Sequence, residues 1–181
     1  MYKIIALIGQ SGAGKDRLLR QILRNCPDAH EIISCTTRPP REGEIEGKSY
    51  HFLDGDTFAH QLIKDEFLEA TVFNDWAYGT RFQDLDENKI NVGVFNPAGI
   101  NILIDNPKID LTVYYVKASD KQRLLRQLNR EENPNVAEII RRYETDQADF
   151  LDLDFDYEIL VNETYEDLPR AIERVVKDNF K

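Results

Sequence analysis

Seven consecutive residues, Gly9 to Lys15, have the types and spacing of a loop that binds phosphate groups. Glycines let the backbone curl until successive N–H groups face one anion, and the helix expected directly after them adds its positive N-terminal end. The Lys15 ammonium can then reach a phosphoryl group that is being transferred. A glycine-rich turn with an incidental lysine is the alternative, but the apolar strand pattern before the loop and the helical pattern after it argue against that interpretation. We therefore predict a phosphate loop made of Gly9, Ser11, Gly12, Ala13, Gly14 and Lys15.

Asp16 follows the phosphate loop at a position where this motif calls for Ser or Thr, whose hydroxyl helps to hold Mg²⁺. A carboxylate is a good ligand for a hard cation, so Asp16 could bind Mg²⁺ directly. It could equally be a residue that favours the first turn of a helix through the helix dipole. Asp16 is thus predicted to lie in the nucleotide site, with both a metal role and a helix-start role left open.

A second candidate phosphate site lies on the loop after residue 35, which Pro39 and Pro40 stiffen. Arg38 and Arg41 are three residues apart on this loop, and Tyr50 follows it. A guanidinium can bond two phosphate oxygens at once, so this pair suits a dianionic monophosphate. Taken alone, the same stretch could be an exposed basic turn, and its residues do not decide between the two.

The wider sequence around these arginines resembles the guanylate kinase family. Ser34-Cys35-Thr36-Thr37-Arg38-Pro39-Pro40-Arg41-Glu42-Gly43-Glu44, followed by Gly47 and Tyr50-His51-Phe52, is similar to the family signature T-T-R-x-x-R-x-G-E…G…Y-x-F. Glu66-Phe67-Leu68-Glu69-Ala70, Tyr78-Gly79-Thr80 and the strand that ends in Val161-Asn162 follow in the family's order and spacing. The resemblance covers nearly the whole chain.

This resemblance implies an ATP:NMP phosphotransferase, a guanylate kinase that moves the γ-phosphoryl group of ATP to GMP or dGMP with Mg²⁺ and gives GDP and ADP. It implies an ATP site at Gly9, Ser11, Gly12, Ala13, Gly14, Lys15 and Asp16, and a GMP phosphate site at Arg38, Arg41, Tyr50 and Tyr78. Ser34, Glu69 and Thr80 match the positions that read guanine. A carboxylate such as Glu69 can accept from the N1–H and the 2-amino group of guanine together, and adenine lacks this pair.

Two lid arginines, Arg130 and Arg142, match family arginines that close on the phosphates and act in catalysis with Lys15. The match at Arg130 requires a small deletion, so Arg126 is the alternative for that position. For Arg142 the alternative is a solvated helix surface, and most arginines between residues 123 and 142 admit the same interpretation.

The segment from Val94 to Gly99 departs from the family, which carries D-x-D-x-Q-G there. Val94 and Asn96 stand at the two acidic positions. Because an acid appears at Asp16 while these two are lost, we hypothesise that the carboxylate of the metal environment has moved across the site. The same substitutions also fit relaxed acceptor specificity. A non-catalytic nucleotide-binding or protein-binding module, and a kinase for another phosphorylated acceptor, are further alternatives that the sequence leaves open.

Around these residues the sequence predicts a three-layer α/β fold of the P-loop NTPase type, in a single domain over residues 1–181. Core strands are expected at 2–8, 30–35, 90–95, 111–116 and 157–161, with helices at 15–24, after Pro97, from Lys121 and at 136–150. Thr164 with Asp167 resembles the cap of a final helix that runs to about residue 179. The core would comprise residues 1–33 and 82–181. A small mixed-strand lobe that binds the monophosphate, residues 34–81, would carry short strands at 50–52, 67–73 and 76–78 with a turn at Asn74–Asp75, and a helix at 57–64. A helical lid is expected at about residues 126–142.

Composition sets limits on partners and location. The net charge of −10 argues against a general nucleic-acid binder, which needs a broad basic surface. The apolar runs are too short to cross a membrane, and the sequence enters a strand-like segment at once, without a signal-type stretch. Cys26 and Cys35 have neither metal nor disulfide spacing, which favours reduced thiols. We expect a cytoplasmic monomer or homodimer that binds the small nucleotides ATP and GMP or dGMP.

Overall fold

The centre of the molecule is a parallel β-sheet. The computed structural model describes residues 1–41, 43–73, 75–130 and 132–180, and within them the core sheet has five strands in the order β2-β7-β1-β8-β9. The strands are β1 (Tyr2–Ile8), β2 (Ala29–Glu31), β7 (Ile90–Val94), β8 (Ile109–Lys117) and β9 (Glu158–Val161). Every pairing in this sheet is parallel, so the carboxyl ends of the strands meet at one edge. The phosphate loop follows β1 at this edge.

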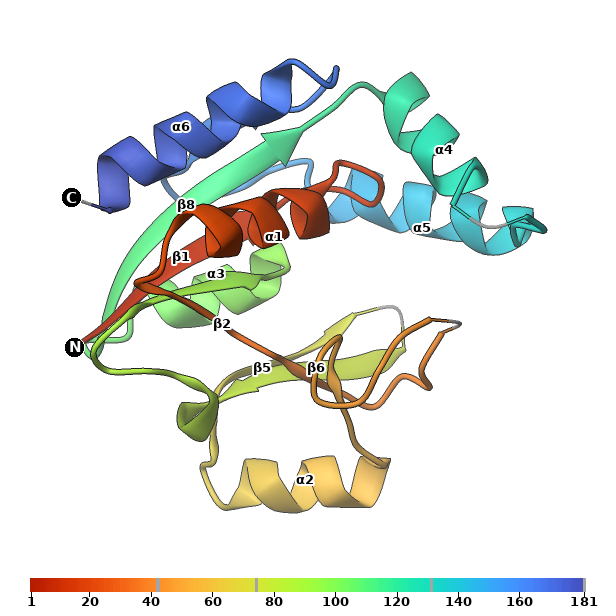
Figure 1. Ribbon diagram of the computed structural model, residues 1–181. Helices are drawn as coiled ribbons and strands as arrows, with labels where there is room; N and C mark the ends of the chain where they lie inside the picture. The colour runs from red at the N-terminus through yellow and green to blue at the C-terminus, as the bar shows by residue number, and fades with distance from the viewer. Residues whose placement is uncertain (42, 74, 131, 181) are drawn as a thin grey trace.

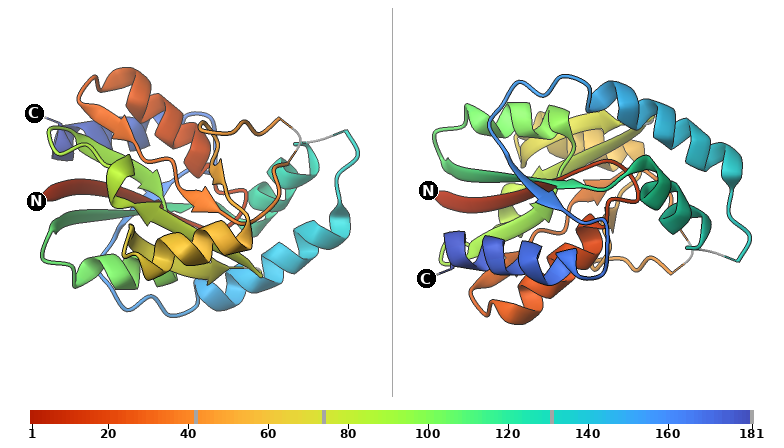
Figure 2. Two further views of the ribbon diagram at one scale, coloured as in Figure 1. Left: turned by 90° about the horizontal axis from the view of Figure 1, so that it is seen from below. Right: turned by 90° about the horizontal axis from the view of Figure 1, so that it is seen from above.

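Helices cover both faces of the core sheet, which explains why β1 is apolar without interruption from Ile4 to Ile8. On one face α1 (Lys15–Asn25) and α6 (Asp167–Asn179) bury residues such as Leu18, Ile22 and Val175. On the other face α3 (Pro97–Ile104) packs through Ile100 and Leu103, together with Phe150 from the end of α5. Figure 2 shows the sheet between these layers.

The second sheet belongs to the region between residues 34 and 81, named here the acceptor lobe. Its order, among the described residues, is β4-β3-β6-β5. The elements are β3 (Cys35–Thr36), β4 (His51–Phe52), α2 (Gly55–Ile63), β5 (Phe67–Phe73) and β6 (Trp76–Arg81). Strands β5 and β6 are antiparallel, whereas β3 and β4 are parallel. Phe58 of α2 stacks on Phe67 with ring centroids 4.5 Å apart, and Cys35 completes this small core. The short helix η1 (Phe82–Asp84) returns the chain to the core.

Two helices, α4 (Asp120–Leu128) and α5 (Val136–Asp149), form the region that contains the predicted lid. The Ser119 hydroxyl accepts from the Gln122 amide and caps α4, and the Asn135 side chain caps α5 by accepting from the Glu138 amide. Figure 1 shows α4 and α5 at the end of the molecule opposite to both termini, and the acceptor lobe beside the core sheet. The phosphate loop lies at the same end as these helices.

The predicted fold class, a three-layer α/β fold with a parallel core sheet and a mixed second sheet, is confirmed. The single strand predicted at residues 30–35 is wrong, because β2 ends at Glu31 and pairs with β7, whereas β3 begins at Cys35 and pairs with β6. The chain crosses between the two sheets in this interval, which an apolar run cannot reveal. The last helix begins at Asp167, whose carboxylate accepts from the Thr164 amide. Asn74 of the predicted turn lies outside the described residues.

No helix in the described ranges is long and apolar enough to span a membrane. Cys26 and Cys35 are both buried free thiols.

Candidate active site

A cavity of about 1050 Å³ lies between the phosphate loop, the acceptor lobe and the lid helices. Its wall includes Lys15 and Asp16 from the core, Glu69 and Arg41 from the acceptor lobe, and Arg142 from α5. Three regions that are far apart in the sequence therefore share one space, which is large enough for more than one small ligand by the usual range of ligand pockets.

The phosphate loop is held by contacts to its carbonyl groups. Arg126 donates to the carbonyls of Gly12 and Ala13 at 3.3 and 3.2 Å, and the Asn162 amide donates to Ala13 at 2.7 Å. Gly12 has a φ of 80°, and a Cβ there would collide with the backbone of Arg123. A side chain at this position is therefore excluded both by conformation and by space. The Ser11 amide is bonded to Asp146 and the Ala13 amide to the Gln10 carbonyl, whereas the amides of Gly12 and Gly14 have no partner among the described residues and can bind an anion.

Lys15 curls back over the loop that precedes it. Its Nζ donates to the Gly9 carbonyl at 2.5 Å and lies 3.4 Å from that of Gln10. Burial lowers the pKa of Lys15, and the nearby Asp16 carboxylate opposes that shift. The ammonium is thus placed over the loop, next to the space that a triphosphate would fill.

Asp16 is exposed at the first turn of α1, and its carboxylate makes no hydrogen bond or ion pair with any part of the chain that the structure describes. Within those residues no group of three or more His, Cys, Asp or Glu side chains is arranged to hold a metal ion. Mg²⁺ at nucleotide sites commonly takes one or two carboxylates plus phosphate oxygens and waters. One unpaired carboxylate beside the phosphate loop fits that donor set.

The acceptor lobe presents a guanidinium that is fixed in place. Arg38 is buried and forms two parallel bonds of 2.9 Å to the Glu44 carboxylate, which also accepts from the Arg41 amide at 2.7 Å. Burial disfavours the charge of Arg38, but the bonds to Glu44 outweigh it and raise its pKa. Glu44 therefore sets the conformation of the loop that carries both arginines.

The Arg41 guanidinium makes no hydrogen bond or ion pair with the described residues. Burial lowers its pKa, and repulsion from Arg142 and Arg38 adds to the effect. Arginine stays protonated in proteins, so Arg41 adds a positive charge beside Arg38 and Arg142, whose charges are paired with Glu44 and Glu138. Tyr50 and Tyr78 meet edge to face beside it, with centroids 6.1 Å apart, and burial raises the pKa of Tyr50 to about 12. This arrangement suits a phosphate dianion.

Glu69 lies deeper in the acceptor lobe and is only 6% exposed. It is opposite Thr80 in the β5–β6 pair, and a Cβ on Gly99 would stand 3.1 Å from its Oε2. Burial raises the pKa of Glu69 to about 7, and the neighbouring Thr80 acts in the other direction. Asn96 lies beside this wall, where it donates to the Thr71 hydroxyl at 2.8 Å and accepts from the Gly99 amide at 2.7 Å. This part of the cavity wall therefore places one buried carboxyl group, whose ionisation burial disfavours, next to neutral polar groups.

Comparison with known proteins places this geometry in a family. The family model for guanylate kinase matches residues 1–179. The chain belongs to the guanylate kinase family. Guanylate kinases of Trichormus variabilis and Thermotoga maritima are 30% and 31% identical to it, over 94% and 96% of this chain and 87% and 84% of their own lengths.

Other relatives match over shorter stretches, and a solved structure shares the fold. A guanylate kinase from Nostoc sp. is 44% identical over 78 residues, which span 43% of this chain and 39% of that protein. The crystal structure of guanylate kinase from Anaplasma phagocytophilum matches with a TM-score of 0.71 at 18% identity, over 99% of this chain and 87% of that one. This last likeness concerns the fold alone.

Most residues predicted for the site lie around the cavity. Those on its wall are Gly9, Ser11, Gly12, Gly14, Lys15, Asp16, Ser34, Arg38, Arg41, Tyr50, Glu69, Tyr78, Arg130 and Arg142. Ala13 and Thr80 are fully buried behind the wall. The roles of all these predicted site residues in binding a ligand remain predictions.

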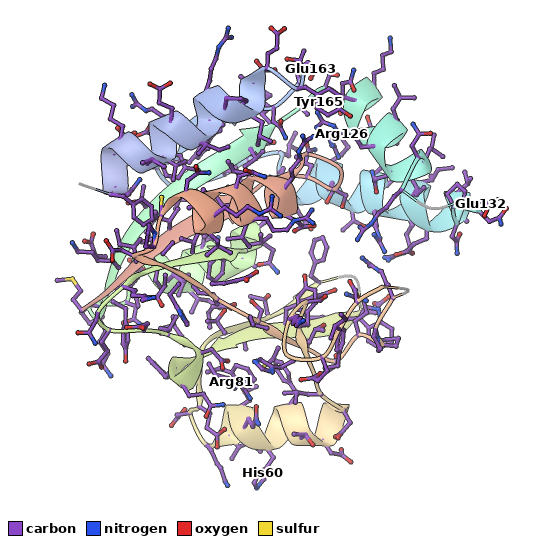
Figure 3. The ribbon with its side chains drawn as sticks, viewed as in Figure 1. His60, Arg81, Arg126, Glu132, Glu163 and Tyr165 are labelled. Atoms are coloured by element: carbon purple, nitrogen blue, oxygen red, sulfur yellow. The ribbon has the colours of Figure 1, made fainter. Side chains whose placement is uncertain are left out.

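The two candidates for the first lid arginine occupy different environments. Arg126 is half-buried, and in addition to the loop carbonyls it donates to the Asn162 carbonyl at 2.7 Å. Figure 3 shows it next to Glu163 and Tyr165, where the ring of Tyr165 also lies under Arg17 at 4.9 Å. Arg130 is exposed and, among described residues, has no side-chain partner. A role in holding the loop therefore suits Arg126, whereas Arg130 is free to approach a ligand.

The structure adds acidic residues that the sequence analysis did not assign. Glu138 accepts from Arg142 at 2.7 Å and from Arg141 at 2.8 and 2.9 Å, and these bonds lower its pKa to about 2. Glu44 thus holds one arginine on the acceptor lobe, and Glu138 holds two arginines on α5. Spacing at i and i+4 in a helix could have suggested the pair of Glu138 with Arg142. The buried pair of Arg123 with Asp146 gave no local signal in the sequence.

Proposed function

We propose that this protein transfers the γ-phosphoryl group of ATP to GMP or dGMP and releases ADP and GDP. The observation that carries the proposal is the shared cavity, because the phosphate loop with Lys15 and the buried Glu69 line the same space of about 1050 Å³. ATP and GMP are also the substrates that the family's name implies. The same proposal treats residues 1–181 as one domain, with its core at 1–33 and 82–181, its acceptor lobe at 34–81 and its lid at about 126–142, since each part contributes to this cavity.

Recognition of GMP would depend on protein groups of opposite charge, with cations at its phosphate and a carboxylate at its guanine. Arg38, Arg41 and the hydroxyls of Tyr50 and Tyr78 would hold the phosphate. The ionised form of Glu69 would accept two N–H groups from guanine, with Ser34 and Thr80 at the remaining polar edge of the base. AMP would leave the buried carboxylate unpaired, at a cost on the order of 100-fold or more in kcat/KM.

In the transfer step, a phosphate oxygen of GMP attacks the γ-phosphorus of ATP. A new P–O bond forms to GMP, the bond between this phosphorus and the β,γ-bridging oxygen breaks, and the electron pair stays on ADP. Lys15 and Arg142, with Arg130 from the lid, would stabilise the negative charge on the oxygens of the migrating group. Enclosure by the lid would exclude water and so limit hydrolysis. No covalent intermediate with the protein is needed.

Mg²⁺ would be held by the phosphates of ATP together with the Asp16 carboxylate, and it would supply charge neutralisation. A carboxylate beside a polyphosphate is repulsive unless a cation lies between them. The unpaired state of Asp16 in the described chain supports this assignment. Asn96 instead bonds to Thr71 and Gly99, so its amide is engaged in joining α3 to the acceptor lobe.

A coupled assay of ADP release tests the proposal. GMP, dGMP, AMP, CMP and UMP are each supplied with ATP, with and without Mg²⁺. We expect turnover with GMP or dGMP, at least 100-fold lower kcat/KM with AMP, and little turnover without Mg²⁺. Preference for another monophosphate would indicate altered acceptor specificity. Nucleotide binding without ADP release would overturn the proposal in favour of a binding module.

A further inference from the structure

The backbone of Ser11, inside the phosphate loop, is held on both sides by charged side chains of the lid helices. Its N–H donates to Asp146 Oδ2 of α5 at 2.6 Å. Its carbonyl accepts from Arg123 Nε of α4 at 3.1 Å. Asp146 and Arg123 also bond to each other at 3.1 Å, which closes a ring of three hydrogen bonds. Side chains of both α4 and α5 therefore form hydrogen bonds with the backbone of Ser11.

Both members of this pair are buried. Arg123 is 0% exposed and Asp146 is 2% exposed. A second bond joins Arg123 to Asp120 at 2.9 Å, and the Arg123 guanidinium lies over the Tyr143 ring of α5 at 5.3 Å. A buried ion pair with its hydrogen bonds satisfied has a defined geometry, and loss of one member leaves the other charge uncompensated. The contact therefore fixes Ser11 more firmly than an exposed pair would.

The position of Asp146 on α5 connects this contact to the lid. Arg142 lies one helical turn before Asp146, and Glu138 one turn before Arg142, where it bonds to that arginine. Helix α5 therefore contacts the phosphate loop through Asp146 and also carries Arg142, a cation of the cavity wall. Because α5 is a single helix, displacement of Asp146 would alter the spacing between the loop and Arg142.

We propose that the Arg123–Asp146 pair is a positioning clamp, which holds Ser11 in the conformation that binds the donor's phosphates and ties the phosphate loop to the lid. This inference rests on the proposed phosphoryl transfer. Asp146 touches the loop and not the reacting atoms, so it is a positioning residue. Its oxygen is needed as a hydrogen-bond acceptor for the Ser11 amide, whereas the charge of Arg123 is balanced by Asp120 as well as by Asp146.

Asp146→Ala and Asp146→Asn separate the acceptor oxygen of Asp146 from its charge, with Asp149→Asn as the matched control because Asp149 is exposed on the same helix. ATP and GMP affinities are measured by titration calorimetry, each nucleotide alone with Mg²⁺, and kcat and both KM values by the coupled assay. We expect Asp146→Ala to weaken ATP binding about tenfold and to leave GMP affinity within about twofold, since hydrogen bonds to charged groups have effects of this order. Asp146→Asn keeps an acceptor oxygen and should recover most of the lost ATP affinity. Asp149→Asn should match the wild type.

A purely structural role would give a different pattern. Partial unfolding would lower kcat and the calorimetric stoichiometry while both affinities of the remaining folded protein stayed at wild-type values. That result, or equal weakening of ATP and GMP, would overturn the clamp. Tighter ATP binding by Asp146→Ala would also overturn it, because the carboxylate would then compete with the donor. If the wild type binds ATP but makes no GDP, the proposed function fails, and the ATP affinities of the variants still decide on the clamp.

Discussion

Replacement of Glu69 by Gln should stabilise the protein at neutral pH while it impairs GMP use. Glu69 is almost completely buried and has no ion pair within the described residues. Burial raises its pKa from 4.5 to about 7. The folded state therefore binds this proton more tightly than the unfolded state does. The contribution of Glu69 is most favourable below pH 4.5 and becomes less favourable as the pH rises toward 7.

The size of this effect follows from the two pKa values. The interval from 4.5 to about 7 corresponds to about 3 kcal/mol of lost stability above pH 7. Gln has nearly the same shape and no charge to bury, so the variant avoids that loss. For a chain of this length, about 3 kcal/mol corresponds to a Tm increase of roughly 6–12 °C.

Thermal unfolding of the wild type and Glu69→Gln, followed by circular dichroism at pH 5, 6, 7 and 8, measures the difference. The two proteins should have similar Tm values at pH 5. The Tm difference in favour of the variant should increase up to about pH 7 and then stay constant. Glu144→Gln, at an exposed position of α5, is the control and should show no such trend. In the coupled assay the Glu69 variant should lose at least tenfold in kcat/KM for GMP. A stability difference that is the same at pH 5 and pH 8 would refute the assigned titration of Glu69.

Three further changes test other parts of the site. Lys15→Ala should lower kcat about a thousandfold with an unchanged circular dichroism spectrum, because it removes charge stabilisation from the migrating group, and activity within a few fold of wild type would show that the phosphate loop is misassigned. Arg41→Ala should raise the KM for GMP at least tenfold with little change in ATP affinity by calorimetry, and the reverse pattern would place this arginine on the donor side. Asp16→Asn should weaken Mg²⁺-dependent turnover and leave metal-free ATP binding unchanged or slightly tighter, whereas wild-type turnover and Mg²⁺ dependence would make Asp16 only a helix-start residue. The double change Asp16→Thr with Asn96→Asp should be more active than either single change.

The phosphate loop and the arginine loop could be predicted because each is encoded within one short stretch of sequence. Glycines at positions 9, 12 and 14 adopt φ values of 152°, 80° and 96°, which other residues rarely do, so the residue types report the backbone conformation directly. Arg38 and Arg41 likewise lie within four residues of each other. The strand expected at 67–73 placed Glu69 in the small lobe, and β5 has these bounds.

The contacts that hold these segments could not be read from the sequence because they join distant residues. Arg123 and Asp146 are 23 residues apart, on different helices. In α4 the charged Arg123 is buried while Leu125 and Leu128 are 42% and 37% exposed, which inverts the usual pattern of an amphipathic helix. The alternative that the arginines between residues 123 and 142 lie on a solvated helix face therefore does not hold for Arg123. Its partner atoms on Ser11 are backbone groups, which leave no trace in the residue types.

The central claim is that the protein moves the terminal phosphoryl group of ATP directly to GMP. Incubation with ATP labelled at the γ-phosphate, GMP and Mg²⁺, followed by chromatographic separation of the nucleotides, tests it most directly. We predict that the label appears in the β-phosphate of GDP at the rate of ADP release, and that Lys15→Ala abolishes both. Label that appears only in inorganic phosphate, or that remains in ATP while both nucleotides bind, would contradict the claim.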